Sequence, residues 1–200
     1  GPSAFSECSN LETINFQDGL YEISDFAFYK CTSLQNFIFP KTVNYIGPSA
    51  FQEDVKLKSI VIPVGVDTIQ RECFDQCNSM ESVTFQGSVT TIEDSGFSSC
   101  HKLVSIAFSD NLQKIGLEAF SQCRSLTRLV IPQSVSFVGN GAFFNCVKLE
   151  SVSFTGISDP QHGNDVFRNT AVLFVDVVSE YTSTEFCGVP VRFPSTPTLE

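Results

Sequence analysis

The 200-residue chain has no tryptophan, one methionine and two histidines, and its 12 Lys and Arg residues are outnumbered by 22 Asp and Glu residues. The formal charge of −10 argues against a nucleic-acid partner and against adsorption to an anionic membrane, because both are bound through clustered basic side chains. No run of 18 apolar residues occurs, so we expect no membrane insertion of this segment. A signal peptide and an N-x-S/T sequon are also missing.

The scarcity of histidine also limits catalytic interpretations. His101 and His162 lie in no zinc-protease motif, nucleophile elbow or recognisable triad, and no phosphate loop or dinucleotide fingerprint is present. A zinc site built from Cys73, Cys77, Cys100 and His101 is an alternative to a purely structural role for these residues. However, the repeat described below already accounts for Cys77 and Cys100. We therefore expect no catalytic residue, no metal and no cofactor, and we interpret the chain as a non-enzyme.

What the chain has in abundance is phenylalanine at a fixed interval of 23 residues. Seven phenylalanines form this series: Phe5, Phe28, Phe51, Phe74, Phe97, Phe120 and Phe143. An apolar residue follows six positions after each of them, as at Leu34, Leu57 and Met80. Periods of this length indicate a repeat array, in which each unit buries its apolar face only by stacking on its neighbours.

One unit shows what each coil should contain. Phe37 and Phe39 alternate with polar or outward residues as in a strand with one buried face, and stacking places equivalent strands in a parallel ladder. Pro40 ends the strand, and Val43 and Ile46 form a second apolar edge. The recurring Ala-Phe-x-x-Cys spacing predicts a short 3₁₀ or α-helical turn on the opposite side. The pattern predicts a right-handed solenoid of 23-residue coils.

The full pattern, intact in Leu34–Phe51 and in Leu126–Cys146, resembles the BspA-like, treponemal-type leucine-rich repeat. The resemblance implies a curved solenoid with the parallel sheet on its concave side. In many members it also implies surface display and attachment of bacteria or parasitic protists to host cells and matrix proteins. The stretch Tyr181–Val191 is similar to tails of protist members, which suggests a surface-protein fragment from a parasitic protist.

The register divides the chain into three parts. Residues 1–155 should form seven repeats, the first one partial, residues 156–193 a degenerate repeat with a C-terminal cap, and residues 194–200 a linker or tail. Within the second part, Thr155–Asp165 is expected to be a loop, and Val172–Val178 the last strand. No comparable cap precedes Phe5, which leaves self-association through an uncapped N-terminal coil as an option.

Seven of the eight cysteines fit the repeat. Six of them share one column of the repeat: Cys8, Cys31, Cys77, Cys100, Cys123 and Cys146. Asp54 occupies this column in the one coil that lacks a cysteine there, and Cys73 occupies a column that holds alanine in most other coils. Equivalent side chains on stacked coils point the same way, which is unsuited to disulfide geometry. We expect buried, reduced, metal-free thiols, while the state of Cys187 stays open.

Recognition in a solenoid falls to the variable positions of its strands. Two columns should face outward on the concave sheet, and from them we predict a partner-binding set: Asn36, Ile38, Ser59, Val61, Ser82, Thr84, Ser105, Ala107, Arg128 and Val130. Arg128 is the predicted anchor, because arginine is enriched at binding hot spots and its column otherwise holds small polar residues. Strand propensity explains the apolar column equally well.

Two non-catalytic functions remain. The leading one, from the resemblance, is a surface adhesion or recognition module, at the cell surface or secreted, that binds a host or matrix protein through the concave face. The alternative is a cytoplasmic protein-binding scaffold, which buried thiols and the missing sequon and signal peptide favour. An enzyme of unrecognised type is a distant third.

Overall fold

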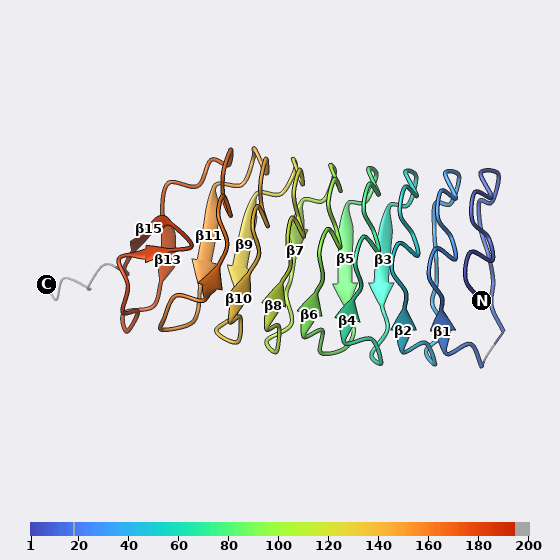
Figure 1. Ribbon diagram of the computed structural model, residues 1–200, viewed down its shortest axis with the longest axis horizontal. Helices are drawn as coiled ribbons and strands as arrows, with labels where there is room; N and C mark the ends of the chain where they lie inside the picture. The colour runs from blue at the N-terminus through green and yellow to red at the C-terminus, as the bar shows by residue number, and fades with distance from the viewer. Residues whose placement is uncertain (18, 195–200) are drawn as a thin grey trace, which may run out of the picture.

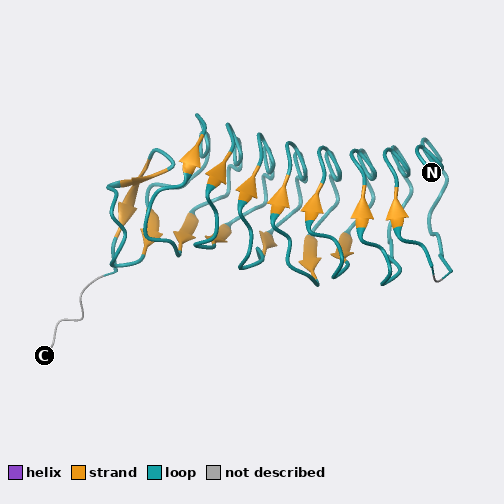
Figure 2. Ribbon diagram, turned by 60° about the horizontal axis from the view of Figure 1, so that its bottom comes forward, coloured by secondary structure: helices purple, strands orange, loops and turns teal. Residues whose placement is uncertain are grey.

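A computed structural model of the protein describes residues 1–17 and 19–194 as one elongated stack of coils, with the first coil at one end of the stack and β13 (Val175–Val177) and β15 (Val189–Arg192) at the other (Figure 1). The regular coils contribute strands to two mainly parallel sheets on different sides of the stack (Figure 2). The long sheet contains β3 (Ser59–Ile62), β5 (Ser82–Phe85), β7 (Ser105–Ile106), β9 (Arg128–Ile131), β11 (Ser151–Phe154), β13, β15 and β14 (Glu185–Phe186).

The short strands have two residues each and occupy the second apolar edge of the coils. Five of them form one ladder: β4 (Thr68–Ile69), β6 (Thr91–Ile92), β8 (Lys114–Ile115), β10 (Phe137–Val138) and β12 (Gln161–His162). A separate pair is formed by β1 (Glu22–Ile23) and β2 (Tyr45–Ile46). In each of these strands except β12 the second residue is buried, as the sequence predicts.

The register of the long sheet confirms the 23-residue coil. Ser59 lies beside Ser82 and Ser82 beside Ser105 in parallel pairing, each one repeat apart. Strands β3 and β9 alternate exposed and buried residues, as strands with one buried face should. The described residues of the first coil form no strand in this sheet, and the second coil joins it only through a single bridge between Asn36 and Ser59, so the regular ladder begins in the third coil, two coils later than expected.

The phenylalanine series forms the predicted spine. Successive rings stack nearly parallel, with centroids 5.3 Å apart for Phe74 and Phe97 and 5.4 Å apart for Phe97 and Phe120. The rings from Phe28 to Phe143 are fully buried, and Phe167 extends the stack past the last regular coil at 5.3 Å from Phe143. Stacking that repeats at every step ties each coil to both neighbours.

The wall that carries this spine consists of turns, and the described residues contain no helix where short helical turns were expected. Two residues in each coil have positive φ, as at Glu72 and Gln76 (55° and 60°). A left-handed residue breaks the helical series of hydrogen bonds after one i to i−3 turn, such as that from Asp75 N–H to the Glu72 carbonyl (3.1 Å). The chain therefore makes a series of single turns.

These turns free alternate N–H groups to bond the next coil. The Phe74 N–H donates to the Gly96 carbonyl at 2.9 Å, from the earlier coil to the later one. At the sheets, bonds such as that from Glu93 N–H to the Ile69 carbonyl (2.9 Å) run from the later coil to the earlier one. Neighbouring coils are thus tied by backbone bonds in both directions.

The cysteine column adds a second set of bonds between coils. The Cys77 thiol donates to the Phe51 carbonyl at 3.1 Å, and the Cys100 thiol donates to the Phe74 carbonyl at 3.3 Å. All eight cysteines are free thiols, and all except Cys8 are buried. Burial raises the pKa of the Cys146 thiol to about 12, so that it stays protonated and able to donate.

Asp54 occupies the cysteine column but does not make the hydrogen bond to the preceding coil that the buried thiols make. Its side chain is fully buried, and neither carboxyl oxygen has a hydrogen-bond partner. Burial raises the pKa of Asp54 to about 9, which makes it a neutral carboxylic acid near pH 7. A neutral acid is tolerated among the thiols, whereas a carboxylate there would lie uncompensated in the core.

We predict that thiol titration of the native protein will detect one rapidly reacting cysteine, Cys8, and that the other seven will react only in denaturant. The physical reason is burial, which blocks access and keeps the thiols protonated. Titration with a chromogenic disulfide, with and without guanidinium, measures both populations. Disulfide-linked peptides found by mass spectrometry would contradict this prediction and would indicate an oxidising compartment.

The C-terminal coil departs from one expectation. Residues 155–165 were expected to form a loop, yet β12 lies within them and pairs with β10, with Val138 beside His162. The extra residue of this coil lies in the chain before Phe167, the spine residue of the coil. Both ladders therefore continue into this coil, through β12 in one sheet and β13 in the other.

The cap consists of the hairpin β14–β15, in which β15 also pairs parallel with β13, so the strand expected within Val172–Val178 is not the last one of the sheet. Phe186 covers the end of the core, with its ring 4.6 Å from that of Phe154. Beyond Pro194, the expected tail lies outside the described residues.

Candidate functional site

The outward side chains of the long sheet form the surface on which the predicted partner-binding set lies, here called the long-sheet face. All ten predicted residues are exposed, including the apolar Ile38 (79%), Val61 (45%) and Val130 (50%). The ladder brings Ser59, Ser82, Ser105 and Arg128 into one row and places Val61 beside Thr84 in the next. Asn36 and Ile38 lie in the second coil of the stack, which joins the long sheet by one bridge.

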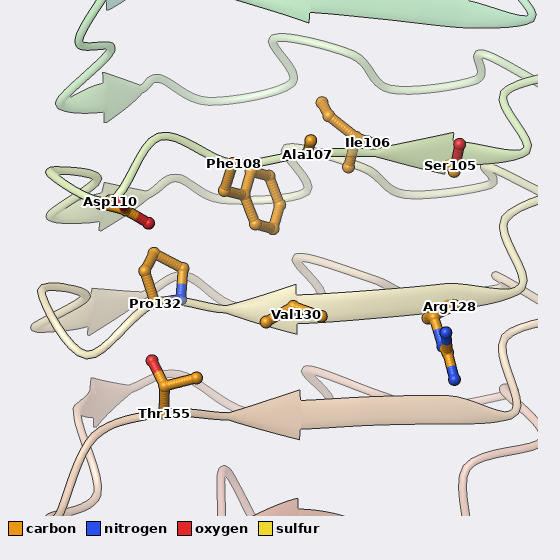
Figure 3. A pocket seen from close by; sticks show the side chains of 9 residues that line it. All are labelled: Ser105, Ile106, Ala107, Phe108, Asp110, Arg128, Val130, Pro132 and Thr155. Atoms are coloured by element: carbon orange, nitrogen blue, oxygen red, sulfur yellow. The ribbon is translucent and has the colours of Figure 1, made fainter.

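Four members of the set line one hollow of about 290 Å³ between β7 and β9, here called the hollow (Figure 3). They are Ser105, Ala107, Arg128 and Val130. The residues that complete its wall were not predicted: Ile106, Phe108, Asp110, Pro132 and Thr155. Of these, Phe108 lies between the two strands in the close view.

The hollow exists because β7 is short. Strand β7 ends at Ile106 while β5 and β9 have four residues each, and β7 pairs with β9 only at Ser105 and Arg128. Ala107 follows, a residue with low strand propensity and a side chain too small to fill the row between Thr84 and Val130. The ladder therefore opens beside Ala107, and the surface sinks towards Phe108.

The hollow has opposite charges at its two ends. Arg128 and Asp110 are both exposed, and neither makes an ion pair or a side-chain hydrogen bond with any residue in the described part of the chain. Between them the lining is mostly apolar, with Ala107, Phe108 and Val130. An arginine without a partner, beside an apolar depression, is typical of a binding hot spot.

Sequence reasoning also missed the far end of the face. The ladder continues from Ser153 to Asp176 and from Asp176 to Arg192, and the Arg192 guanidinium donates to both carboxylate oxygens of Asp176, at 2.6 and 2.9 Å. This bond lowers the pKa of Asp176. Asp176 lies 23 residues after Ser153, so continuing the column through the degenerate coil would have found it. Arg192 carries no such signal, because it lies outside the repeat.

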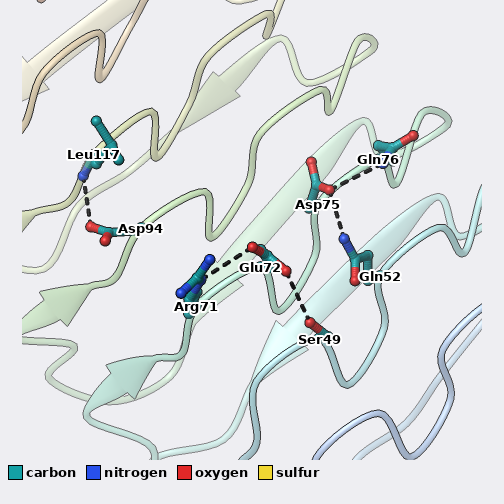
Figure 4. Close-up of polar contacts among 8 residues, drawn as sticks. All are labelled: Ser49, Gln52, Arg71, Glu72, Asp75, Gln76, Asp94 and Leu117. Atoms are coloured by element: carbon teal, nitrogen blue, oxygen red, sulfur yellow. Dashed lines mark hydrogen bonds and ion pairs between the residues drawn. The ribbon is translucent and has the colours of Figure 1, made fainter.

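The turn wall is the other polar surface of the stack, and several of its charged groups already have partners (Figure 4). Glu72 accepts hydrogen bonds from Arg71 (3.1 Å) and from the Ser49 hydroxyl (3.3 Å). In the same way, Asp75 accepts from two side-chain amides, those of Gln52 (2.9 Å) and Gln76 (3.2 Å). The bonds from Ser49 to Glu72 and from Gln52 to Asp75 connect neighbouring coils, so we assign these two acidic side chains to the framework.

Two candidate sites for chemistry come from the sequence, the Cys100–His101 pair and a metal site. Burial raises the pKa of the Cys100 thiol well above its ordinary range, and burial lowers the pKa of the adjacent His101, so this pair does not form an activated thiolate. Within residues 1–17 and 19–194, no three His, Cys, Asp or Glu side chains are grouped closely enough to hold a metal ion. The described residues include no helix with the length and apolar character needed to span a bilayer.

Comparison with protein families gives one match, to the BspA type leucine rich repeat region, in six copies over residues 1–103 and 46–173. A search of curated proteins finds no match. Solenoids of this repeat type are protein-interaction folds, typically without catalysis.

Three solved structures share the fold. A leucine-rich repeat protein from Bacteroides ovatus is 25% identical (TM-score 0.68), with 97% of this chain and 57% of that chain covered. A leucine rich cell surface protein from Faecalibacterium prausnitzii is 23% identical (TM-score 0.57), with 88% and 62% covered. The Treponema pallidum leucine rich repeat protein is 24% identical (TM-score 0.60), with 90% and 75% covered. None of the three comes from a protist, so the expected protist origin gains no support.

Proposed function

Because the chain belongs to the BspA-type leucine-rich repeat family, we propose that it is a non-catalytic recognition module that binds a protein through the long-sheet face. The observation that carries this proposal is the hollow, where Arg128 lacks an ion-pair partner among the described residues beside exposed Val130 and Ala107. The fold supports it, since the residues that vary between coils are the ones that face solvent on this sheet.

The finer proposal is adhesion to a host or matrix protein at the cell surface or after secretion. The neighbour from F. prausnitzii, which is named a cell surface protein, supports this location. The chain spans 57% and 62% of the first two neighbours, so the activity of a longer protein is part of the proposal. Self-association through the first coil, where Phe5, Leu11 and Phe16 are only partly buried, belongs to it as well.

The cytoplasmic scaffold remains the second candidate. The observation in its favour is the set of seven buried free thiols, which a reducing compartment preserves. The thiol titration described above separates the two locations, because disulfides in protein isolated from its source would argue against the scaffold.

We predict that Arg128→Ala, and separately Val61→Asp combined with Val130→Asp, will lower partner capture about tenfold. Each change alters exposed side chains of the long-sheet face, so the free energy of unfolding should change by less than about 0.5 kcal/mol per site. Capture is measured by quantitative pull-down from host-cell extract and from extract of the source cell.

Lys102→Glu is the matched control, because Lys102 is exposed in the turn that precedes β7 and lies outside the face. It should leave capture unchanged. Loss of capture with Lys102→Glu, together with full capture by the Arg128 and Val61/Val130 variants, would show that the binding face is misassigned and that the apolar row reflects strand propensity alone.

A further inference from the structure

The hollow defines the chemistry of a ligand more narrowly than the face as a whole. We propose that it binds an extended segment of a protein partner that carries an acidic side chain, an apolar side chain and a basic side chain at alternate positions. The acidic group lies at Arg128, the apolar one on Ala107 and Phe108, and the basic one at Asp110. This inference rests on the proposed function and specifies the partner's sequence pattern.

The charges of the hollow set the order of the pattern. Arg128 lies beside Ser105 in the ladder, and Asp110 follows Ser105 by five residues, so the backbone positions of the two charged residues are at most about 17 Å apart along the strand direction. A ligand with one charge satisfies one end only. A ligand with opposite charges at this separation satisfies both, and the net charge of −10 on the chain disfavours a purely acidic one.

The residues at the floor of the hollow favour an apolar side chain at the central position of the ligand. Phe108 is partly exposed, as is Phe85 on the neighbouring strand, whereas the equivalent residues Phe39, Ile62, Ile131 and Phe154 are buried. Val130 adds an exposed apolar edge, and Ala107 leaves the space that a larger residue would fill. An apolar side chain placed here covers Phe108 and removes both surfaces from water.

The shape of the hollow favours an extended segment over an enclosed small molecule. Its volume of about 290 Å³ is at the lower limit of small-molecule sites, which are about 300–1,000 Å³, and Arg128, Val130 and Asp110 on its rim are exposed. It runs between two parallel strands, along the direction in which an extended chain presents every second side chain on one side. Acidic and basic residues four positions apart span about 13 Å, and a lysine side chain reaches the rest.

The test uses blocked heptapeptides with glycine at each end, labelled for fluorescence anisotropy, and the whole 200-residue protein. The first peptide has the core Glu-Ser-Leu-Ser-Lys. In three controls the leucine is replaced by serine, the lysine by glutamate, or the glutamate by lysine. We expect the first peptide to bind about tenfold more tightly than each control.

Charge reversal on the protein should move this preference. We expect Arg128→Glu to favour the peptide with two lysines, and Asp110→Lys to favour the peptide with two glutamates, each by about tenfold. Ala107→Ile should weaken all peptides with leucine, because it fills the hollow, while its exposed position and β-branched side chain leave the fold intact. Circular dichroism melts of each variant verify folding.

Two results would overturn the inference. One is an affinity for the first peptide no greater than for the peptides with two lysines or two glutamates in folded wild-type protein, and the other is a preference that persists in the folded charge-reversal variants. If no peptide binds while Val61→Asp still lowers partner capture, the pattern is wrong and the long-sheet face stands. If capture is also indifferent to Val61→Asp and Arg128→Ala, the proposed function fails with it.

Discussion

Phe97→Ala is expected to lower the free energy of unfolding by about 3–5 kcal/mol, the usual range for removing a buried aromatic ring. Phe97 is fully buried, and its ring stacks on Phe74 at 5.3 Å and on Phe120 at 5.4 Å. Removing it leaves a cavity in the middle of the spine and weakens two interfaces between coils at once. Because a solenoid is stabilised by nearest-neighbour contacts, the two halves should also unfold less cooperatively.

Urea denaturation followed by circular dichroism measures both effects, as a lower midpoint and a broader transition. Val104→Ala is the matched control, since Val104 is exposed in the same coil and should change stability by less than about 0.5 kcal/mol. An unchanged midpoint for Phe97→Ala would refute the buried spine.

The second large effect concerns the buried acid. Asp54→Cys is expected to stabilise the protein, and the gain should grow by about 1.4 kcal/mol for each pH unit between about pH 5 and pH 8. Burial holds the folded pKa of Asp54 at about 9, while the unfolded chain has its ordinary value near 4. Between these values the folded protein keeps a proton that the unfolded chain releases, so wild-type stability falls as pH rises.

A cysteine at this position restores the column and removes that release. The difference in unfolding free energy between Asp54→Cys and wild type should therefore increase by about 4 kcal/mol from pH 5 to pH 8. Urea titrations at three pH values measure it. Asp67→Asn, at an exposed position, controls for the loss of one formal charge. A difference independent of pH would show that Asp54 is ionised in the folded protein.

The framework could be predicted because most buried positions recur, with the same type of residue, in successive coils. A phenylalanine such as Phe97 recurs at one interval, and only a buried position demands the same bulk in every coil. The outward exposure of residues such as Val61 then follows from strand alternation. The single turns of the wall did not follow, because Glu72 and Gln76 are not residues that signal positive φ.

The hollow could not be predicted for a different reason. It depends on where one strand ends, and the end of β7 at Ile106 is a property of a single coil. Asp110 lies in a turn whose path the repeat does not define, so nothing in the pattern places it opposite Arg128. The protonation of Asp54 is likewise a property of its surroundings: the column identified the position, but not the absence of partners.

The opposed backbone bonds of the two kinds of wall have an electrostatic consequence. In an α-helix the peptide dipoles align and add, so that partial charges of opposite sign collect at its ends. Here the turn wall donates forward, as Phe74 does to Gly96, and the sheets donate backward, as Glu93 does to Ile69. Their dipoles partly cancel. A stack of this kind can therefore lengthen by whole coils while accumulating a smaller macrodipole along its axis than a helix of the same length.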